Sequence, residues 1–349
     1  MTDRGSERRI LLCDTASLYF RAYHALPTSL TDVTGRPVNA VHGLLDMLAR
    51  LIATYRPDQV VCAWDVDWRP TWRVALVPGY KAQRVSDRVT TDAVGAGGVG
   101  ATSRQQESAP ADLSAQLPLI TSALGMVGFP IIGLADYEAD DVLGTLTRLV
   151  TEQGGSSVVV TGDRDLFQLV DTRTRVAYLA RGVRNHELVD DPWLLNRYGI
   201  AGGQYADFAT LRGDASDGLP GVPGIGEKTA AKLIARFGDL DAVRAAASGD
   251  APAPATNGMT VPNGVSVPNG VPDQPMAPAL RSRLLANQDY LQRARQVVRV
   301  VRDLPLELPD TLMGQADPEA CALFADDHRV RGPMMRLLAA MGQRLQGGA

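Results

Sequence analysis

Residues 137–165 constrain the fold more than any other part of this chain, because they place carboxylates at both ends of a predicted helix–strand unit. Apolar residues at helical spacing follow the first acids, a double glycine comes next, and the β-branched run 158–161 leads to the second acids. This order predicts a helix, a turn and a buried strand with an acidic carboxyl end, the end at which parallel sheets bind ligands. The carboxylates are Glu138, Asp140, Asp141, Asp163 and Asp165.

Five carboxylates this close together repel one another and stay ionised only beside a counter-charge, a role that a bound hard cation fills well. Glu138 and Asp141 are three residues apart, so on a helix they would share a face. Acids also favour the first turn of any helix, so the triplet alone fits a solvated helix start equally well. The second acidic pair, at a strand end, favours the metal site.

Two earlier segments repeat the pattern of an apolar strand that ends on an acid. Residues 9–14 end on Asp14, and residues 58–65 end on Asp65. With the strand before Asp163, they predict a parallel sheet that gathers carboxylates at one edge. Further strands are predicted at 129–134 and 175–179, and helices at 15–23, 40–55, 117–128, 166–170, 192–198 and 203–212.

Residues 68–84 interleave cations with aromatic rings, a combination that suits phosphates and unstacked bases. The alternative is an ordinary surface loop whose long cationic side chains lie along apolar surface. The cations are Arg69, Arg73, Lys81 and Arg84, and the rings are Trp68, Trp72 and Tyr80. A long polar connection follows at 85–118, with a glycine-rich centre at 94–100. Such a connection within a domain is usually a functional lid or disordered.

Residues 213–238 combine two more acids, Asp214 and Asp217, with a glycine turn that precedes a predicted helix. A Gly-x-Gly turn at a helix start presents backbone N–H groups to an anion. The turn residues are Gly224, Ile225 and Gly226, and Lys228 and Lys232 add charge. Residues 249–278, rich in Pro, Gly and Asn, predict a flexible insertion. The remainder predicts helices at 280–300, 318–324 and 330–346.

The net charge of −4 does not exclude a nucleic-acid partner, because nine of the 39 acids are assigned below to one metal site. Setting these nine aside leaves 30 acids against 35 basic residues, a balance of +5. Cys13, Cys62 and Cys321 are widely spaced, which favours buried free thiols in a reducing cytoplasm over disulfides or a zinc site. No apolar run is long enough to span a membrane.

Together these motifs resemble the 5′-nuclease (flap endonuclease) superfamily, and most closely the 5′–3′ exonuclease domain at the amino end of bacterial DNA polymerase I. The resemblance covers residues 9–301. It is carried by LLCDTASLYFRAYHALP, LTDVTGRPVNAVHGLLDML, RVALVPGYKAQR, YEADDVLGTL, VTGDRDLFQLV and LRGDASDGLPGVPGIGEKTAAKLI. No polymerase portion follows in this sequence, so we expect a stand-alone member. The glycine-rich centre of the lid departs from the family, whose arch is shorter and partly helical.

The resemblance implies an α/β fold: a central, mostly parallel sheet flanked by helices as a PIN-like 5′-nuclease core, with a helical helix–hairpin–helix region. The expected units are a core at 1–190 that includes an arch or lid at 69–118, a DNA-binding region at 191–301 with the insertion at 249–278, and a C-terminal helical extension at 302–349.

The resemblance also implies the site residues. The family's metal ligands fall on Asp14, Asp65, Glu138 and Asp140 around one ion, on Asp163, Asp165 and Asp217 around a second, and on Asp141 and Asp214, acting directly or through water. Basic positions near the scissile phosphate and the base of the arch fall on Arg21, Arg73, Lys81 and Arg84. DNA-binding positions fall on Tyr80, Gly224, Ile225, Gly226, Lys228 and Thr229. The expected cofactors are two Mg²⁺ or Mn²⁺ ions, with a third left open, and K⁺ at the helix–hairpin–helix.

The implied activity is a structure-selective 5′–3′ exonuclease and flap endonuclease that cuts DNA to 5′-phosphate products in replication and repair. The expected partner is double-stranded DNA with a 5′ flap or 5′ end, with an RNA/DNA hybrid left open. We expect a monomeric, cytoplasmic, nucleoid-associated bacterial protein. Three alternatives remain: a PIN-type ribonuclease, which needs neither the glycine turn nor the lid; a non-catalytic DNA-binding protein, in which some ligands would be replaced; and a phosphatase.

Overall fold

The computed structural model of the protein describes residues 8–85, 109–249 and 275–342. The glycine-rich centre of the predicted lid and the VPNG repeats of the predicted insertion lie outside these ranges. Within them, no helix is long and apolar enough to cross a membrane.

A six-stranded sheet forms the centre of the molecule, in the order β3-β2-β1-β4-β5-β6. Strands β1 to β5 pair in parallel, and β6 joins the edge antiparallel to β5. The strands are β1 (Arg9–Asp14), β2 (Gln59–Ala63), β3 (Ile131–Ile132), β4 (Ser156–Thr161), β5 (Thr174–Tyr178) and β6 (Glu187–Val189). The predicted α/β fold with a mostly parallel sheet is confirmed. Strand β6 was not predicted, because three residues are too few to show the alternation of apolar and polar residues that marks a strand.

Helices cover both faces of the sheet, which explains why β1 is apolar almost throughout. Successive residues point to opposite faces, so Ile10 and Leu12 join one core while Leu11 and Cys13 join the other. The Cys13 core contains α1 (Thr15–Ala25), α2 (Asn39–Tyr55), α4 (Ala111–Ser114), α5 (Leu117–Met126), α13 (Pro318–Asp327) and α14 (Arg331–Ala340). The C-terminal helices therefore complete the core on this face: Met334, Leu337 and Leu338 are buried.

The opposite face carries α3 (Thr71–Leu76), α6 (Ala139–Glu152) and a helical unit of six helices. These six are α7 (Asp191–Tyr198), α8 (Tyr205–Arg212), α9 (Glu227–Phe237), α10 (Leu240–Ser248), α11 (Pro278–Ala286) and α12 (Gln288–Val298). Short 3₁₀ helices are η1 (Ala82–Arg84), η2 (Asp165–Leu169), η3 (Val183–Asn185), η4 (Gly202–Gln204) and η5 (Ala215–Asp217). The single helix predicted at 280–300 is broken at Asn287, and the segment predicted only as basic and aromatic contains α3 and η1.

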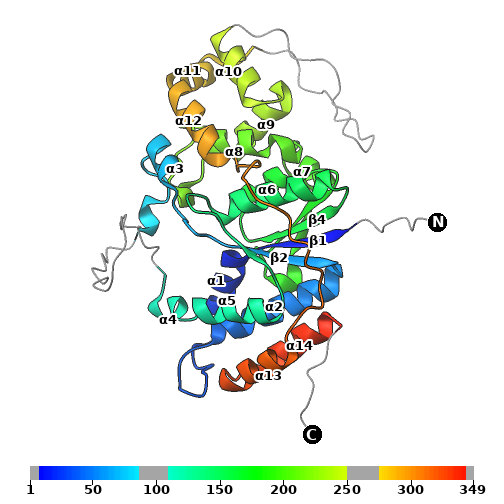
Figure 1. Ribbon diagram of the computed structural model, residues 1–349. Coiled ribbons are helices and arrows are strands. Elements are labelled where there is room, and N and C mark those ends of the chain that lie inside the picture. The colour runs from blue at the N-terminus through cyan, green and yellow to red at the C-terminus, as the bar shows by residue number, and fades with distance from the viewer. Residues whose placement is uncertain (1–7, 86–108, 250–274, 343–349) are drawn as a thin grey trace, which may run out of the picture.

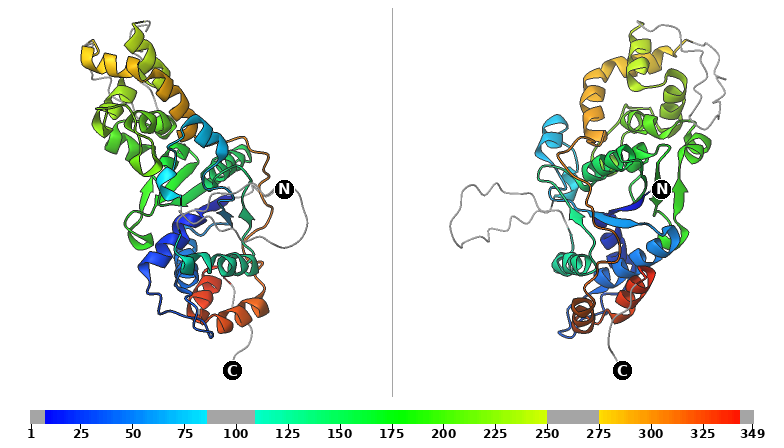
Figure 2. Two further views of the ribbon diagram at one scale, coloured as in Figure 1. Left: turned by 90° about the vertical axis from the view of Figure 1, so that its left-hand side faces the viewer. Right: turned by 45° about the vertical axis from the view of Figure 1, so that its right-hand side comes forward.

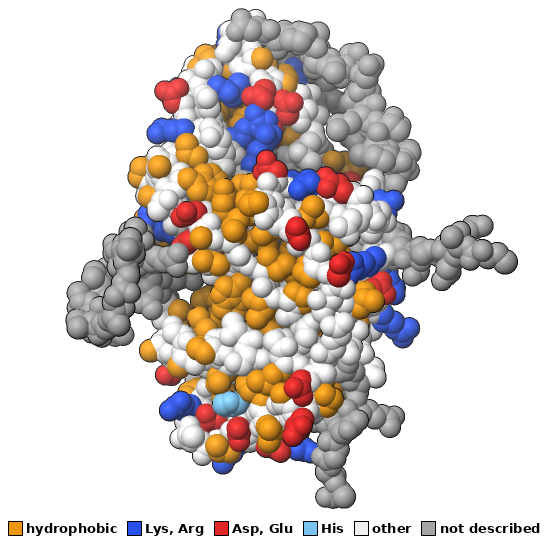
Figure 3. Space-filling model, in the orientation of Figure 1, with side chains coloured by type: hydrophobic (Ala, Val, Ile, Leu, Met, Phe, Trp, Pro, Cys, Tyr) orange, Lys and Arg blue, Asp and Glu red, His pale blue; other side chains and the backbone are white. Residues whose placement is uncertain are grey.

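Figures 1 and 2 show the sheet in the middle of an elongated molecule, with α9 to α12 at one end and α13 and α14 at the other. The chain runs back from α12 to α13 as an extended segment. It is fixed on the way by hydrogen bonds from Val301 to Asp141 and from Met313 to Asp58. Figure 3 shows hydrophobic side chains concentrated over the middle of one face, with charged side chains mostly above and below.

The register of the sheet brings the predicted acids to one edge. Asp14, the last residue of β1, pairs with Ala63 at the end of β2. Asp65 lies two residues beyond that strand, and Asp163 lies two residues beyond β4, whose Val160 pairs with Cys13. The three strand-end carboxylates therefore emerge side by side, as their sequence positions predict.

A candidate active site at the acidic edge of the sheet

Asp14 connects the first strand to the first helix. As the N-cap of α1 it accepts hydrogen bonds from the backbone N–H of Ser17 at 3.1 Å and from its hydroxyl at 2.5 Å. A third bond comes from the hydroxyl of Thr161 on β4, at 2.7 Å. Burial raises the pKa of Asp14 and outweighs these bonds, which favour the charged form. Asp14 is thus a fixed, desolvated carboxylate.

Asp65 and Asp140, both half-buried, lie near Asp14. The backbone N–H of Ala139, at the start of α6, donates to Asp65 at 2.7 Å and joins the β2 end to that helix. Burial raises the pKa of Asp65 to about 7, although Lys81 opposes the shift. Burial, followed by repulsion from Asp163 and Asp14, raises the pKa of Asp140 well above its ordinary value. The charges are close enough to destabilise one another.

Glu138 is surrounded by donors. It is 2% exposed and accepts from the Tyr80 hydroxyl at 3.0 Å and from Nζ of Lys81 at 3.0 Å. Tyr80, which the sequence predicts as a DNA-binding residue, is 4% exposed, and its hydroxyl supports this carboxylate. Lys81 has a left-handed backbone with φ 48°, and its N–H donates to the carbonyl of Asp217 at 2.9 Å. This bond joins the cationic loop to the second acidic segment.

Asp141 is held by Arg73, whose guanidinium also lies 3.2 Å from Glu138. Its two oxygens accept from Arg73 at 2.9 and 2.7 Å, from the backbone N–H of Val301 at 2.8 Å and from that of Glu138 at 3.2 Å. Asp141 is 0% exposed and Arg73 is 2% exposed. A carboxylate that accepts four hydrogen bonds has its lone pairs filled, and a buried guanidinium cannot reach a substrate phosphate. The sequence predicts Asp141 as a metal ligand, acting directly or through water, and Arg73 as a cation near the scissile phosphate and the base of the arch. In the structure each is the main partner of the other.

The second acidic group comes from β4 and from the segment around η5. The backbone N–H of Asp165 donates to Asp163 at 2.8 Å. Arg212 lies 3.4 Å from Asp165 and 3.5 Å from Asp214, and it holds these two segments together. Burial, followed by repulsion from Asp163, raises the pKa of Asp165 to about 8. Although burial opposes it, hydrogen bonds from Ser216 hold the pKa of Asp214 below its ordinary value.

Asp217 is the point at which the basic loop and the acids meet. It is 8% exposed and pairs with Arg84 at 2.6 Å. Burial raises its pKa to about 6, with Lys81 opposing. Gly218 follows with φ +70°, and a Cβ there would collide with the carbonyl of Gly79. Glycine is therefore required where the 79–84 loop packs against this turn.

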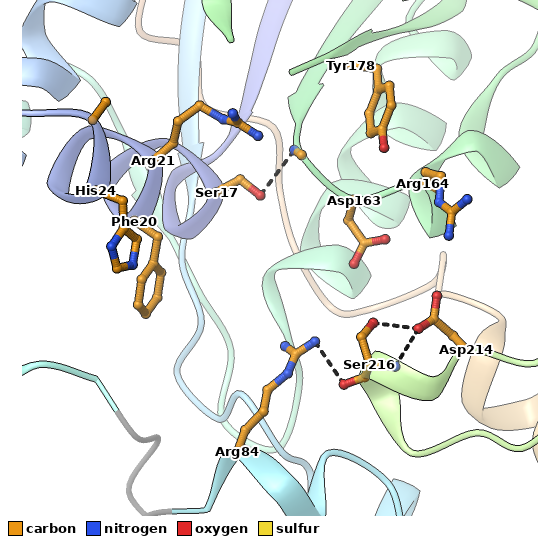
Figure 4. A pocket seen from close by; sticks show the side chains of 12 residues that line it. Ser17, Phe20, Arg21, His24, Arg84, Asp163, Arg164, Tyr178, Asp214 and Ser216 are labelled. Carbon is orange, nitrogen blue, oxygen red and sulfur yellow. Dashed lines mark hydrogen bonds between the residues drawn. The ribbon is translucent and has the colours of Figure 1, made fainter. Parts of the chain in front are cut away.

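An open cavity of about 680 Å³ lies beside the second group. Arg21, Arg84, Arg164 and Asp163 line this cavity, and Figure 4 shows the three arginines arranged around Asp163. No role was predicted from the sequence for Ser17, Arg164, Tyr178 or Arg212. Only Ser17 had a local signal, since a hydroxyl three residues after an N-cap aspartate often bonds it.

The glycine turn lies in the helical unit, outside this cavity. Gly224 has φ +78°, Ile225 is buried, and Gly226 is the N-cap of α9. Lys228 is exposed in the first turn of that helix, while Thr229 is half-buried and its N–H bonds the carbonyl of Gly226. A Cβ at Gly226 would meet nothing within 4 Å. The surface at Gly226 is therefore open to a ligand, whereas a Cβ at Gly224 would meet the guanidinium of Arg283 at 2.5 Å.

Among the described parts of the chain, no three carboxylate, imidazole or thiol groups lie close enough to hold one ion as they are placed. The acids are instead paired with Lys81, Arg84 and Arg212. The donor set nevertheless fits a hard divalent cation, because every group is a carboxylate oxygen. Burial, followed by repulsion between neighbouring acids, raises the pKa values of five of these acids, and a bound cation would offset both effects.

The parallel sheet with an acidic carboxyl edge, the flanking cations and the helical unit with a glycine turn together define a nuclease of the PIN-like 5′-nuclease class. The family model "5′-3′ exonuclease, N-terminal resolvase-like domain" matches residues 9–199, and "5′-3′ exonuclease, C-terminal SAM fold" matches residues 200–319. The chain belongs to the 5′–3′ exonuclease family, which confirms the resemblance read from its motifs.

Two relatives cover nearly the whole chain. A 5′-3′ exonuclease of Streptomyces coelicolor is 44% identical over 95% of this chain and 99% of its own length. A 5′-3′ exonuclease of Mycobacterium tuberculosis is 39% identical over 95% of this chain and 97% of its own length. The bacteriophage T5 D15 flap endonuclease, solved with DNA and metal ions, shares the fold: its TM-score is 0.58 at 15% identity, covering 96% of this chain and all of that one. The alternatives of a PIN-type ribonuclease, a phosphatase and a binding-only protein find no support in these matches.

Proposed function

We propose that this protein hydrolyses DNA phosphodiesters as a structure-selective 5′–3′ exonuclease and flap endonuclease, and that it leaves 5′-phosphate products in replication and repair. The observation that carries the proposal is the gathering of buried carboxylates, with cations beside them, at the carboxyl edge of the sheet. Metal ions and DNA in the T5 relative support a cleavage role for this edge.

Asp14, Asp65, Glu138 and Asp140 are proposed to hold one divalent cation, and Asp163, Asp165 and Asp217 a second, with Asp214 acting through water. When bound, Mg²⁺ or Mn²⁺ would lower the pKa of a coordinated water and stabilise charge on the phosphoryl group and the leaving oxygen. Asp141 is given a supporting role instead: with Arg73 it fixes the start of α6 and so orients Glu138 and Asp140.

Lys81 and Arg84 are proposed to contact the scissile phosphate. They pair with Glu138 and Asp217, so they already lie at the acidic edge. Contact with the phosphate would stabilise the charge that develops there during hydrolysis. Arg21, which lines the open cavity with Arg84, would contact the same strand.

The helix–hairpin–helix turn is proposed to grip duplex DNA through the backbone N–H groups of Gly224 to Gly226, assisted by Lys228 and Thr229. A helix N-terminus favours phosphate, and the open surface at Gly226 permits close approach. The backbone carbonyls of the turn would hold K⁺, which would add positive charge for a phosphate. The partner is DNA with a 5′ flap or a 5′ end, bound by a monomer.

A 5′-labelled flap duplex incubated with Mg²⁺, Mn²⁺ or EDTA tests the proposal. We expect cuts near the junction of single strand and duplex with either metal and none in EDTA. Cleavage of single-stranded RNA alone would indicate a ribonuclease. DNA binding without cleavage in either metal would show that the acidic edge is not catalytic.

A further inference from the structure

A cavity of about 870 Å³, larger than the arginine-lined one, lies between helices on the Cys13 face of the sheet. Four elements form its walls: the end of α1, α2, η3 and α14. Helix α2 packs against α1 and α14, and η3 also contacts it, so these elements hold one another in place. We call this cavity the α2 groove. None of the residues that line it belongs to the proposed metal site.

The lining of the α2 groove is mostly apolar, and short side chains keep it open. Ala49 and Ala53 on α2 and Ala340 on α14 each present only a methyl group, which leaves space between the helices. Leu26 and Met47, both half-buried, supply larger apolar surface. A concave and mostly apolar site of this kind accepts the apolar side chains of a partner.

Three arginines from different elements also line the groove: Arg50 on α2, Arg184 in η3 and Arg336 on α14. Arg336 is neutralised by Asp46, to which it donates hydrogen bonds at 2.7 and 3.1 Å. Arg50 and Arg184 are exposed, and neither forms an ion pair with any residue in the described ranges. Since Asp46 is the one acid among the described residues of the lining, the groove carries a net charge of +2.

This combination of an apolar lining and two unpaired cations suits an acidic peptide that carries apolar side chains. Single-stranded nucleic acid is disfavoured, because its binding sites stack bases on aromatic rings, and the lining has no aromatic residue among those described. The end of this chain, residues 343–349, contains Arg344 and no acid, so its charge does not complement the groove. We propose that the α2 groove binds an acidic segment of a partner protein, with one or two apolar side chains in the groove and carboxylates paired with Arg50 and Arg184.

The groove lies next to the catalytic cavity and takes no part in its chemistry. Ala25, the last residue of α1, lines both cavities, whereas none of the proposed metal ligands or phosphate-contacting cations lines the groove. A bound partner would therefore lie beside the nuclease site and leave it free for DNA. The inference goes beyond the proposed function and does not depend on it.

Selection of peptides from a random phage-displayed library, with the folded full-length protein immobilised, tests the proposal. We expect the enriched peptides to combine several acids with one or two large apolar residues. Arg50→Glu/Arg184→Glu should weaken binding of a labelled selected peptide about 10-fold or more, measured by fluorescence anisotropy, because each change turns an exposed attraction into a repulsion. The matched control is Arg175→Glu/Arg293→Glu, which reverses two exposed arginines outside the groove and gives the same net charge.

A second variant blocks the groove without changing its charge. Ala53→Trp places a large side chain in the lining, and the protein should fold normally because Ala53 is exposed. It should weaken binding of the selected peptide as the double variant does. Flap cleavage by Arg50→Glu/Arg184→Glu should equal that of the control variant, because neither arginine lines the catalytic cavity.

The inference is refuted if no acidic peptide is enriched, or if the selected peptides bind both groove variants as tightly as the control. A loss of DNA affinity in the groove variants and not in the control would mean that DNA occupies the groove. A wild-type dimer, detected by light scattering and lost in the groove variants, would mean that a second copy of the chain does. Either result would also overturn the proposal. Cleavage by the wild type tests only the proposed function, so the two conclusions can fail separately.

Discussion

Asp141→Ala is expected to lower the free energy of unfolding by about 3–5 kcal/mol, because it leaves a buried guanidinium without its main partner. Arg73 is 2% exposed and forms two hydrogen bonds with Asp141, at 2.9 and 2.7 Å. Glu138 still faces Arg73 at 3.2 Å, and the carbonyl of Val297 accepts from it at 3.1 Å. These remaining contacts place the expected loss near the lower end, about 3 kcal/mol.

Urea unfolding followed by far-ultraviolet circular dichroism, with EDTA present, measures this loss without any contribution from metal binding. The matched control is Asp326→Ala, which breaks an exposed pair with Arg331 and should cost about 0–1 kcal/mol. The double variant Arg73→Met/Asp141→Leu should recover only part of the loss. Apolar groups can replace a buried pair, but the backbone N–H groups of Val301 and Glu138 would lose their acceptor.

The single variant Asp141→Ala also distinguishes a structural role of Asp141 from a role as a metal ligand. Folded Asp141→Ala protein should still bind Mn²⁺, because the four hydrogen bonds that fill the carboxylate leave it no role as a ligand. If its unfolding free energy matches that of Asp326→Ala while Mn²⁺ binding is lost, then Asp141 is a ligand and the supporting role is wrong.

Three further predictions follow from the site. Asp163→Ala should abolish flap cleavage and keep DNA affinity within a few-fold, measured by anisotropy; retained turnover would remove Asp163 from the metal site. Gly226→Val should fold normally, because the backbone φ of −88° suits valine and a Cβ at this position would meet nothing within 4 Å. The variant should nevertheless bind duplex DNA more weakly and with a smaller dependence on salt concentration. Unchanged affinity would exclude the turn as a DNA contact. In EDTA, the free energy of unfolding should fall as pH rises from about 4 to about 8. Burial raises the pKa of Asp65 to about 7 and that of Asp165 to about 8. The folded state therefore retains protons in this range that the unfolded chain releases. Urea unfolding across this range should show a shallower fall for Asp165→Asn, and stability that rises with pH would contradict the argument.

The edge of the sheet was predictable because it follows from local rules. An apolar strand that ends on aspartate places that residue at the carboxyl edge wherever the strand lies in a parallel sheet, so Asp14, Asp65 and Asp163 needed no tertiary information. The glycine turn was equally local, since the Gly224 and Gly226 positions precede a clear helical period.

The orientation of neighbouring acids on α6 was not predictable. Asp140 and Asp141 are adjacent in sequence, and which one faces the site depends on how the helix is rotated against the sheet. That rotation is fixed by Arg73, 68 positions earlier, and by Val301, 160 positions later. The environment of Tyr80 was not predictable for the same reason: its residue type suits DNA, and its hydroxyl contacts Glu138, 58 positions later.

The prediction of helix boundaries was wrong where tertiary contacts determine where a helix ends. The break at Asn287 contains neither proline nor glycine, so the 280–300 pattern looked continuous. The C-terminal helices were predicted as a C-terminal helical extension, and the sequence did not indicate that Met334 and Leu337 are buried in the core that also contains α2. Amphipathic periodicity shows that a face is buried and does not show against which element.

A Mn²⁺ titration by isothermal calorimetry, with wild-type and Asp163→Ala protein under identical conditions, tests the metal centre at the acidic edge most directly. We predict two Mn²⁺ ions per wild-type chain and fewer for the variant, with proton release on binding because the buried acids must ionise. Absence of Mn²⁺ uptake by the folded wild type, or equal uptake by both proteins, would contradict the account.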